Sequence, residues 1–196
     1  MSMKKPFLAA AAATAAALAC LAGGAQAQSA SYAIDPGHTF VTFEVLHFGT
    51  STARGRFDKK EGTVQFDRAG KTGKVEISID TASINTGVAA FDNHLRNADF
   101  FNAAMFPTAK FVSDKFVFSG DKVSEVSGTL TLLDKSQPVT LKAANFNCYE
   151  NPRLKREVCG GDFETTLQRS QFGMNYGLPN IPDSVRLTVQ IEAVKQ

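Results

Sequence analysis

The sequence lacks tryptophan altogether and contains only three cysteines and three histidines among its 196 residues. No G-x-S-x-G, P-loop, G-x-G-x-x-G or H-E-x-x-H motif occurs in it, so the common hydrolase, nucleotide-binding and zinc-protease signatures are missing. Ser, His and Asp are present, but scattered residues do not define a catalytic triad. We therefore expect no catalytic residue, no cofactor and no metal site.

An excess of charge is also missing once the N-terminus is set aside. Lys4 and Lys5 are the only charged residues in the range 1–27, so the 21 lysines and arginines fall to 19, equal to the 19 aspartates and glutamates. A neutral chain without a basic block gives no electrostatic reason to expect nucleic acid or an anionic membrane as a partner.

Only one long apolar run is present, and it lies at the N-terminus. A positive start precedes the alanine-rich run 7–22, and Ala-Gln-Ala at 25–27 is a small-x-small cleavage site, which predicts a cleavable signal peptide. The run falls short of the about 20 apolar residues that a spanning helix needs. A lipoprotein anchored through Cys20 is the alternative. Residues 28–196 are then expected to form one exported domain, located in the periplasm.

The two cysteines that remain after cleavage of the signal peptide are consistent with export. After cleavage Cys148 and Cys159 remain as an even pair in an oxidising compartment, and they bracket a polar loop between two strand-like runs. We predict that they form a disulfide, which would contribute about 2–3 kcal/mol. A metal site would need further ligands nearby, and none of the histidines is close in sequence.

Most of the mature sequence alternates apolar and polar residues with a period of two, which is typical of half-buried antiparallel strands. Strands are predicted over residues 38–48, 54–58, 62–67, 74–80, 108–118, 123–133, 139–149, 159–171 and 184–194. Residues 54–67 are expected to form a hairpin that turns at 59–61. The fold class is therefore all-β.

Eight or nine strands in one small domain must protect their edges, and closure into a barrel does this most completely. We predict an eight-stranded antiparallel barrel with a short helical insertion near one end, in preference to a two-sheet sandwich. The reason is that the first and last long strands are able to pair.

The helical insertion is expected where charged residues and phenylalanines are densest, over residues 92–111. Apolar positions at helical spacing predict a helix with Asn85 or Thr86 as its N-cap. Asp99 is expected to cap a second short turn and to pair with Arg96, before Pro107 ends the segment.

The histidines leave several roles open. A zinc site of His38, His47 and His94 is disfavoured, because His38 and His47 differ by an odd number within one strand and so point to opposite faces. His94 and Arg96 fit a structural role, contact with a ligand headgroup, or a general base with an anion clamp.

Phenylalanine is abundant, with 16 in the chain and 15 after removal of Phe7 with the signal peptide. A filled core and a ligand tunnel look alike in sequence, so composition does not separate a solid barrel that docks on a partner from a hollow one.

Three stretches resemble a known family: YAIDPGHTFVTFEVLHFGTSTARGRFDKKEGTV, NHLRNADFFNAAMFPTAKF and RSQFGMNYGLPNIPDSVRLTVQIEA. They are similar to the YceI-like family of exported, lipocalin-like barrels, and the resemblance spans essentially the whole mature chain. It implies a protein without catalytic residues that holds a long apolar lipid, notably a polyisoprenoid such as ubiquinone or polyprenyl phosphate. Relatives beside or fused to cytochrome b561-type membrane proteins imply such a partner, with a monomer or a homodimer equally open.

The resemblance and the inward-facing rows together select the expected ligand-binding residues. They are Val41, Phe43, Val45, His47, Phe66, Ile77, Ile79, Phe91, His94, Leu95, Arg96, Phe100, Phe101, Met105, Phe106, Phe111, Leu130, Leu132, Leu141, Phe172 and Met174.

Overall fold

The computed structural model describes Met1 and residues 29–196, which are almost entirely β-structure. The predicted signal peptide lies outside these described residues, apart from Met1. The elements are β1 (Ala30–Ile34), β2 (Phe40–His47), β3 (Ser51–Phe57), β4 (Lys60–Asp67), β5 (Thr72–Asp80), η1 (Thr81–Ser83), β6 (Ile84–Asn85), α1 (Ala89–Arg96), β7 (Thr108–Ser119), β8 (Lys122–Leu132), β9 (Lys135–Asn151), β10 (Arg156–Gln168), η2 (Arg169–Phe172) and β11 (Ser184–Lys195).

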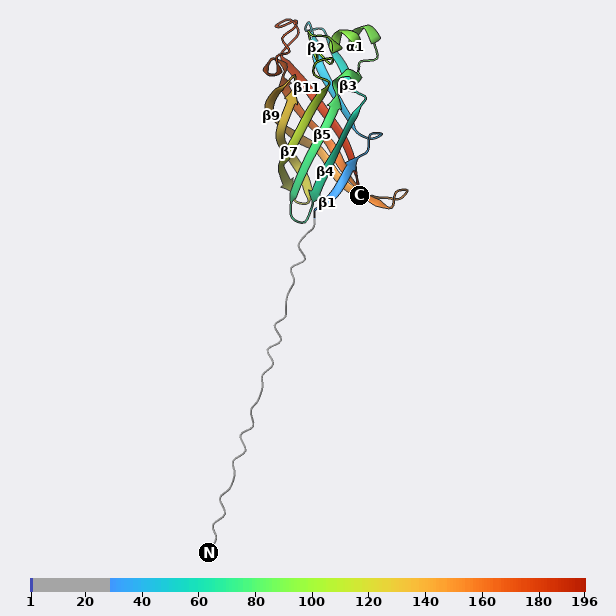
Figure 1. Cartoon of the computed structure of the whole chain (residues 1–196), viewed down its shortest axis with the longest axis vertical. Helices are drawn as coiled ribbons and strands as arrows, with labels where there is room; N and C mark the ends of the chain where they lie inside the picture. The colour runs from blue at the N-terminus through green and yellow to red at the C-terminus, as the bar shows by residue number, and fades with distance from the viewer. Residues whose placement is uncertain (2–28) are drawn as a thin grey trace.

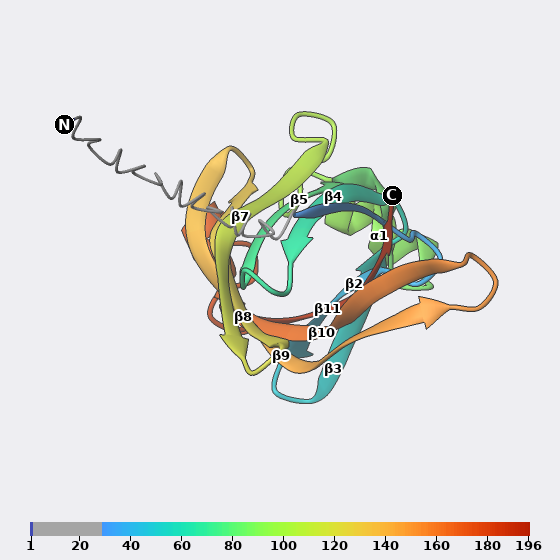
Figure 2. The same cartoon turned by 90° about the horizontal axis from the view of Figure 1, so that it is seen from below.

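Eight of the strands close into an antiparallel barrel, seen from the side in Figure 1 and end-on in Figure 2. Their order is β1-β4-β5-β7-β8-β9-β10-β11, and pairing of β1 with β11, for example Tyr32 with Lys195, completes the circle. Closure satisfies the backbone groups that an open sheet would expose at its edges. The predicted all-β, eight-stranded barrel is confirmed.

Two of the eight barrel strands are interrupted by a bend, so that each consists of two labelled elements. β1 pairs with β4 and β2 pairs with β3, both antiparallel, with Ala30 opposite Phe66 and Val41 opposite Phe57. β2 also pairs with β11, whereas β3 pairs with the short β6. β1 and β2 are thus successive parts of one strand, and β3 and β4 are successive parts of the next.

The hairpin predicted over residues 54–67 is therefore wrong. Within residues 29–196, β3 and β4 are not paired with each other, and the polar residues between them mark a bend instead of a reversal. The chain reverses earlier, at residues 48–50, where the Thr50 N–H donates to the His47 carbonyl at 2.9 Å. Polar residues suit a bend and a turn alike, so only the distant pairing partners distinguish the two.

The helix α1 lies at the barrel end that also carries the turn between β2 and β3 (Figure 1). We call this the upper end, and the end with the C-terminus the lower end. Val88 is the N-cap, without a side-chain hydrogen bond, so the predicted caps Asn85 and Thr86 are wrong. The bonding runs the other way: Asp92 Oδ1, on the helix, accepts from both the N–H and the Oγ1 of Thr86 at 2.7 Å. No helix in the described part of the chain is long and apolar enough to cross a membrane.

The expected pairing of Arg96 with Asp99 is also absent from the described residues. Arg96 Nε donates to the Ala82 carbonyl at 2.7 Å and Nη2 to the Ile84 carbonyl at 2.9 Å. Asp99 is exposed, and its N–H donates to the side-chain oxygen of Asn97 at 2.9 Å, so Asn97 holds this turn. Arg96 thereby ties α1 to the segment that precedes it.

Candidate ligand-binding cavity

The upper half of the barrel encloses a cavity of about 580 Å³, here called the upper cavity. This volume lies within the range of about 300–1,000 Å³ that is usual for small-molecule sites. The barrel is therefore hollow here, which argues against a solid barrel whose only function is docking. The predicted ligand-binding residues that line it are Phe43, Val45, His47, Ile79, Phe91, His94, Leu95, Phe100, Phe101, Leu130, Leu132, Phe172 and Met174.

Three aromatic rings join the segments around the mouth of this cavity. The ring of His94, on α1, lies 5.0 Å from that of Phe100 and 5.3 Å from that of Tyr176, and Phe100 lies 5.3 Å from Tyr176. The ring of Phe101 instead lies 5.4 Å from that of Phe57 on β3. Phe100 thus packs against the loop of residues 173–183, which we call the mouth loop, and Phe101 packs against the barrel wall.

Arg169 holds the mouth loop to the barrel. Its side chain is only 5% exposed, yet among the described residues it makes no ion pair. Its guanidinium instead donates to four backbone carbonyls of the loop at 2.8–3.0 Å, those of Met174, Tyr176, Ile181 and Pro182. Burial lowers the pKa of Arg169, and the nearby charge of Asp183 acts in the opposite direction. Gly173 ends η2 at φ 87°, a left-handed conformation that glycine adopts without strain.

Polar and apolar side chains are separated along the upper cavity. The polar ones come from the end of β2, from α1, from η2 and from the mouth loop, and they are His47, His94, Arg169, Tyr176 and Asn180. Ile79, Leu130 and Leu187 line the deeper part, next to residues of a second cavity. The site therefore suits an amphiphile with its apolar chain inside and its polar end at the mouth.

The second cavity, here called the lower cavity, is smaller, at about 70 Å³, and its lining is almost wholly apolar. The predicted residues Phe66, Ile77, Phe111 and Leu141 line it. Its one hydroxyl, that of Tyr32, donates to Glu157 Oε1 at 2.7 Å. Burial and this hydrogen bond raise the pKa of Tyr32 well above its ordinary value.

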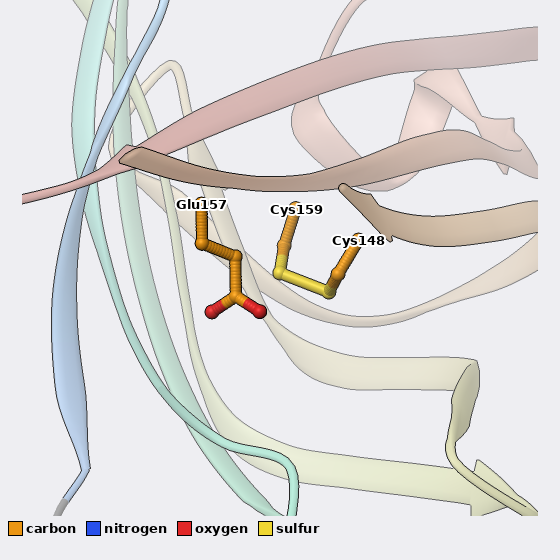
Figure 3. Close-up of side chains that lie close together, drawn as sticks. All are labelled: Cys148, Glu157 and Cys159. Carbon is orange, nitrogen blue, oxygen red and sulfur yellow. A yellow bond between two sulfur atoms is a disulfide. The ribbon is translucent and has the colours of Figure 1, made fainter. Parts of the chain in front are cut away.

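The predicted Cys148–Cys159 disulfide is present and belongs to this lower wall. Cys159 lines the lower cavity and faces Cys148 directly across the β9–β10 pair. Figure 3 shows Glu157 beside the bridge; these three side chains are the one group in the described residues close enough together to suggest a metal site. Because the sulfurs are bonded to each other, the group offers a single carboxylate and does not form such a site.

Four predicted residues line neither cavity. Val41 is buried in the core, whereas Met105 is 71% exposed and Phe106 lies beside it in the same turn. Arg96 lines a separate, polar pocket outside the barrel together with Asp58 and other residues that precede α1. Helical spacing in the sequence did not indicate the direction of the turn after α1, which carries Met105 and Phe106.

A family model described as the YceI-like domain matches residues 32–193. This chain belongs to the YceI-like family. Two YceI-like relatives of similar length are UPF0312 proteins. That of Pseudomonas putida is 34% identical and is aligned over 99% of both chains. That of Pseudomonas aeruginosa is 34% identical over 87% of this chain and 90% of its own.

Solved structures share the YceI-like barrel. BcnA of Burkholderia cenocepacia superposes with a TM-score of 0.67 at 24% identity, over 83% of this chain and 99% of BcnA. The YCEI protein of Campylobacter jejuni gives 0.68 at 26% identity, over 74% and 86% of the two chains. A polyisoprenoid binding domain from Saccharophagus degradans gives 0.62 at 14% identity, over 86% and 100%.

The geometry also bears on the enzyme hypothesis for this YceI-like chain. His94 lines the upper cavity, but Arg96 points its donors at the carbonyls outside the barrel. The two side chains therefore do not form a base and an anion clamp around one ligand. The histidines are likewise divided: His47 and His94 line the upper cavity, while His38 pairs with Asp35 at 2.8 Å.

Sequence reasoning missed several residues of the site, chiefly Phe57, Arg169, Tyr176 and Leu187. Leu187 alternates inward along the last strand, so its period-two position was a usable signal. Arg169 stands in the stretch RSQFG, which carries part of the resemblance to the YceI-like family, but an isolated arginine in a strand-like run reads as exposed.

Proposed function

We propose that this protein binds a long-chain isoprenoid or a similar lipid in the upper cavity. The observation that carries the proposal is the separation of its lining, with a polar mouth and an apolar interior. A lipid would place its chain among Ile79, Leu130 and Leu187 and its headgroup near His94 and Arg169. The related fold of a domain described as polyisoprenoid-binding supports the same ligand class.

Burial of the chain would supply most of the affinity. A dozen methylene-like carbons at ~0.8 kcal/mol each give a gross gain of roughly 10 kcal/mol before the costs of association. Selectivity for the headgroup should be weaker, because few polar side chains face the ligand. We propose binding without catalysis, since His94 and Arg96, the candidate base and anion clamp, do not face one ligand.

The cellular location, the specific ligand and the partner are proposed from the sequence. The signal-like residues 1–27 and the Cys148–Cys159 disulfide support export to the periplasm. Ubiquinone is the specific ligand that we propose within the isoprenoid class, and a cytochrome b561-type membrane protein is the proposed partner. Both rest on the resemblance to the YceI-like family.

The test is to purify the protein from its native host and to identify extracted lipid by mass spectrometry. Wild-type protein should carry an isoprenoid lipid in stoichiometric amount. Ala53→Trp, which fills the upper cavity from β3, should be purified without lipid, whereas Val117→Trp, on the exposed face of β7, should retain it. Wild-type protein that is empty and binds neither quinone nor polyprenol would refute the proposal.

A further inference from the structure

The two cavities follow each other along the barrel. On β5, Ile79 lines the upper cavity and Ile77 the lower one. On β11, Leu187 lines the upper cavity and Val189 the lower one. Residues two apart in a strand are successive inward-facing positions. The cavities are therefore separated by no more than one layer of side chains, and a chain whose end displaced that layer would pass from the first into the second.

Two strand glycines make room for aromatic rings in these cavities. Gly55, on β3, lies opposite Phe43, and a Cβ atom there would stand 2.7 Å from Cε1 of that ring and still closer to Cζ. Gly73, on β5, lies under Phe116, and a Cβ atom there would stand 2.7 Å from both Cδ1 and Cε1. Both distances are shorter than real Cβ contacts, so each ring occupies space that only glycine leaves free.

These two positions differ from other strand glycines of the barrel. At Gly62 and Gly160 the nearest atom to an added Cβ is a backbone carbonyl oxygen, so glycine there permits close approach of strands. At Gly55 and Gly73 all three nearest atoms belong to side chains. A side chain is able to turn away, and the direction left open is the interior, because Phe43 lines the upper cavity and Phe116 the lower one.

We propose that Gly55 and Gly73 determine the size of the lipid that the barrel accepts, by holding Phe43 and Phe116 flat against the wall. Gly55 sets the capacity of the upper cavity, and Gly73 sets whether the end of a long chain enters the lower cavity. The inference rests on the proposed function. The ligand class that it defines is a lipid whose apolar chain is longer than the upper cavity alone accommodates.

The volumes give the scale of the effect. At about 30 Å³ for each water-sized group, the upper cavity of about 580 Å³ holds roughly 20 carbon-sized groups and the lower one of about 70 Å³ roughly two. Each methylene buried changes affinity about fourfold, so closing the lower cavity should weaken a long chain by roughly tenfold or more. A short chain, confined to the upper cavity, should be unaffected.

The experiment measures binding of farnesol and geranylgeraniol, a shorter and a longer prenyl alcohol, to delipidated full-length protein by native mass spectrometry. Gly73→Ala should weaken the binding of geranylgeraniol by about tenfold and leave the binding of farnesol unchanged. Gly55→Ala should weaken both. Lys74→Ala, the exposed neighbour of Gly73 on the outer face, is the matched control and should change neither.

A second substitution separates loss of space from loss of structure. Gly73→Ala with Phe116→Leu removes part of the ring and should restore geranylgeraniol binding, and Phe116→Trp should reproduce the loss with the glycine intact. Glycine variants that bind both alcohols as wild type does would overturn this inference but not the proposed function. So would a Gly73→Ala variant that binds both alcohols more weakly by the same factor. Wild-type protein that binds neither alcohol would overturn the proposed function as well.

Discussion

At the scale of single residues, Arg169 is the side chain on which the shape of the mouth depends most. A buried cation without a carboxylate partner is costly unless its donors are satisfied, and here four loop carbonyls accept from it. The same bonds satisfy carbonyls of a loop that has no regular structure of its own. The hydrogen bonds from Arg169 therefore replace those that its guanidinium would make to water, and they also fix the conformation of the mouth loop.

Replacing this side chain tests that account. Arg169→Met retains much of the apolar stem but leaves four carbonyls without their donor, and we expect a loss of about 3 kcal/mol or more in the free energy of unfolding. Arg169→Lys should recover only part of it, because an ammonium does not match the fork of the guanidinium. Urea denaturation of delipidated protein measures both; a loss below about 1 kcal/mol for the methionine variant would contradict the role assigned here.

At the scale of elements, the mouth loop is fastened at its far end by a carboxylate. Asp183 accepts from the Ser170 N–H at 2.7 Å and from the Ser170 Oγ at 2.6 Å, which joins the start of β11 to η2. The hydrogen bond from the Ser170 hydroxyl holds the pKa of Asp183 below its ordinary value, and the Ser170 N–H and the charge of Arg169 act in the same direction.

This shift gives the loop a defined response to acid. Because the pKa of Asp183 is lower in the folded than in the unfolded state, its stabilisation is fully present above the unfolded value of about 3.9 and is lost as the pH falls through the folded value. Asp183→Asn keeps the shape without the charge. The difference in melting temperature between wild type and this variant should therefore shrink on acidification below about pH 4. A difference that stays constant across this range would be evidence against the assignment.

The elements also show how far local sequence patterns reach. Period-two alternation located nearly all the strands, because each has one buried face. It did not distinguish the bend at Asp58 from a turn, since that depends on the pairing of β3 with β2 and of β4 with β1, which the residues around Asp58 do not determine. The caps of α1 were misassigned for a related reason: Thr86 donates to Asp92 instead of accepting from the helix.

At the scale of the whole molecule, the sequence could not say which phenylalanines fill the core and which line a cavity. Phe43 packs against Gly55, Phe116 packs against Gly73, and the ring of Phe100 lies 5.3 Å from that of Tyr176. The last two of these pairs join segments that are distant along the chain, and all three depend on how the strands and loops meet in the barrel. The strand pattern predicted the barrel and the resemblance to the YceI-like family implied the ligand class, but neither predicted the division of the interior into two cavities.

At the lower end of the barrel, the disulfide links β9 and β10 beside the lower cavity and away from the upper cavity, in which we propose that the lipid headgroup lies. Reducing the bridge should lower the free energy of unfolding by about 2–3 kcal/mol, because the unfolded chain gains freedom. Binding of a short prenyl alcohol should not change, since Cys159 lines only the lower cavity. Urea denaturation and native mass spectrometry, each with and without reductant, measure the two effects.

The control is the double variant Cys148→Ala, Cys159→Ala, which should match the reduced protein in stability and should not change when reductant is added. Loss of the short alcohol on reduction would show that the lower wall also shapes the upper cavity, and that the two ends do not act separately.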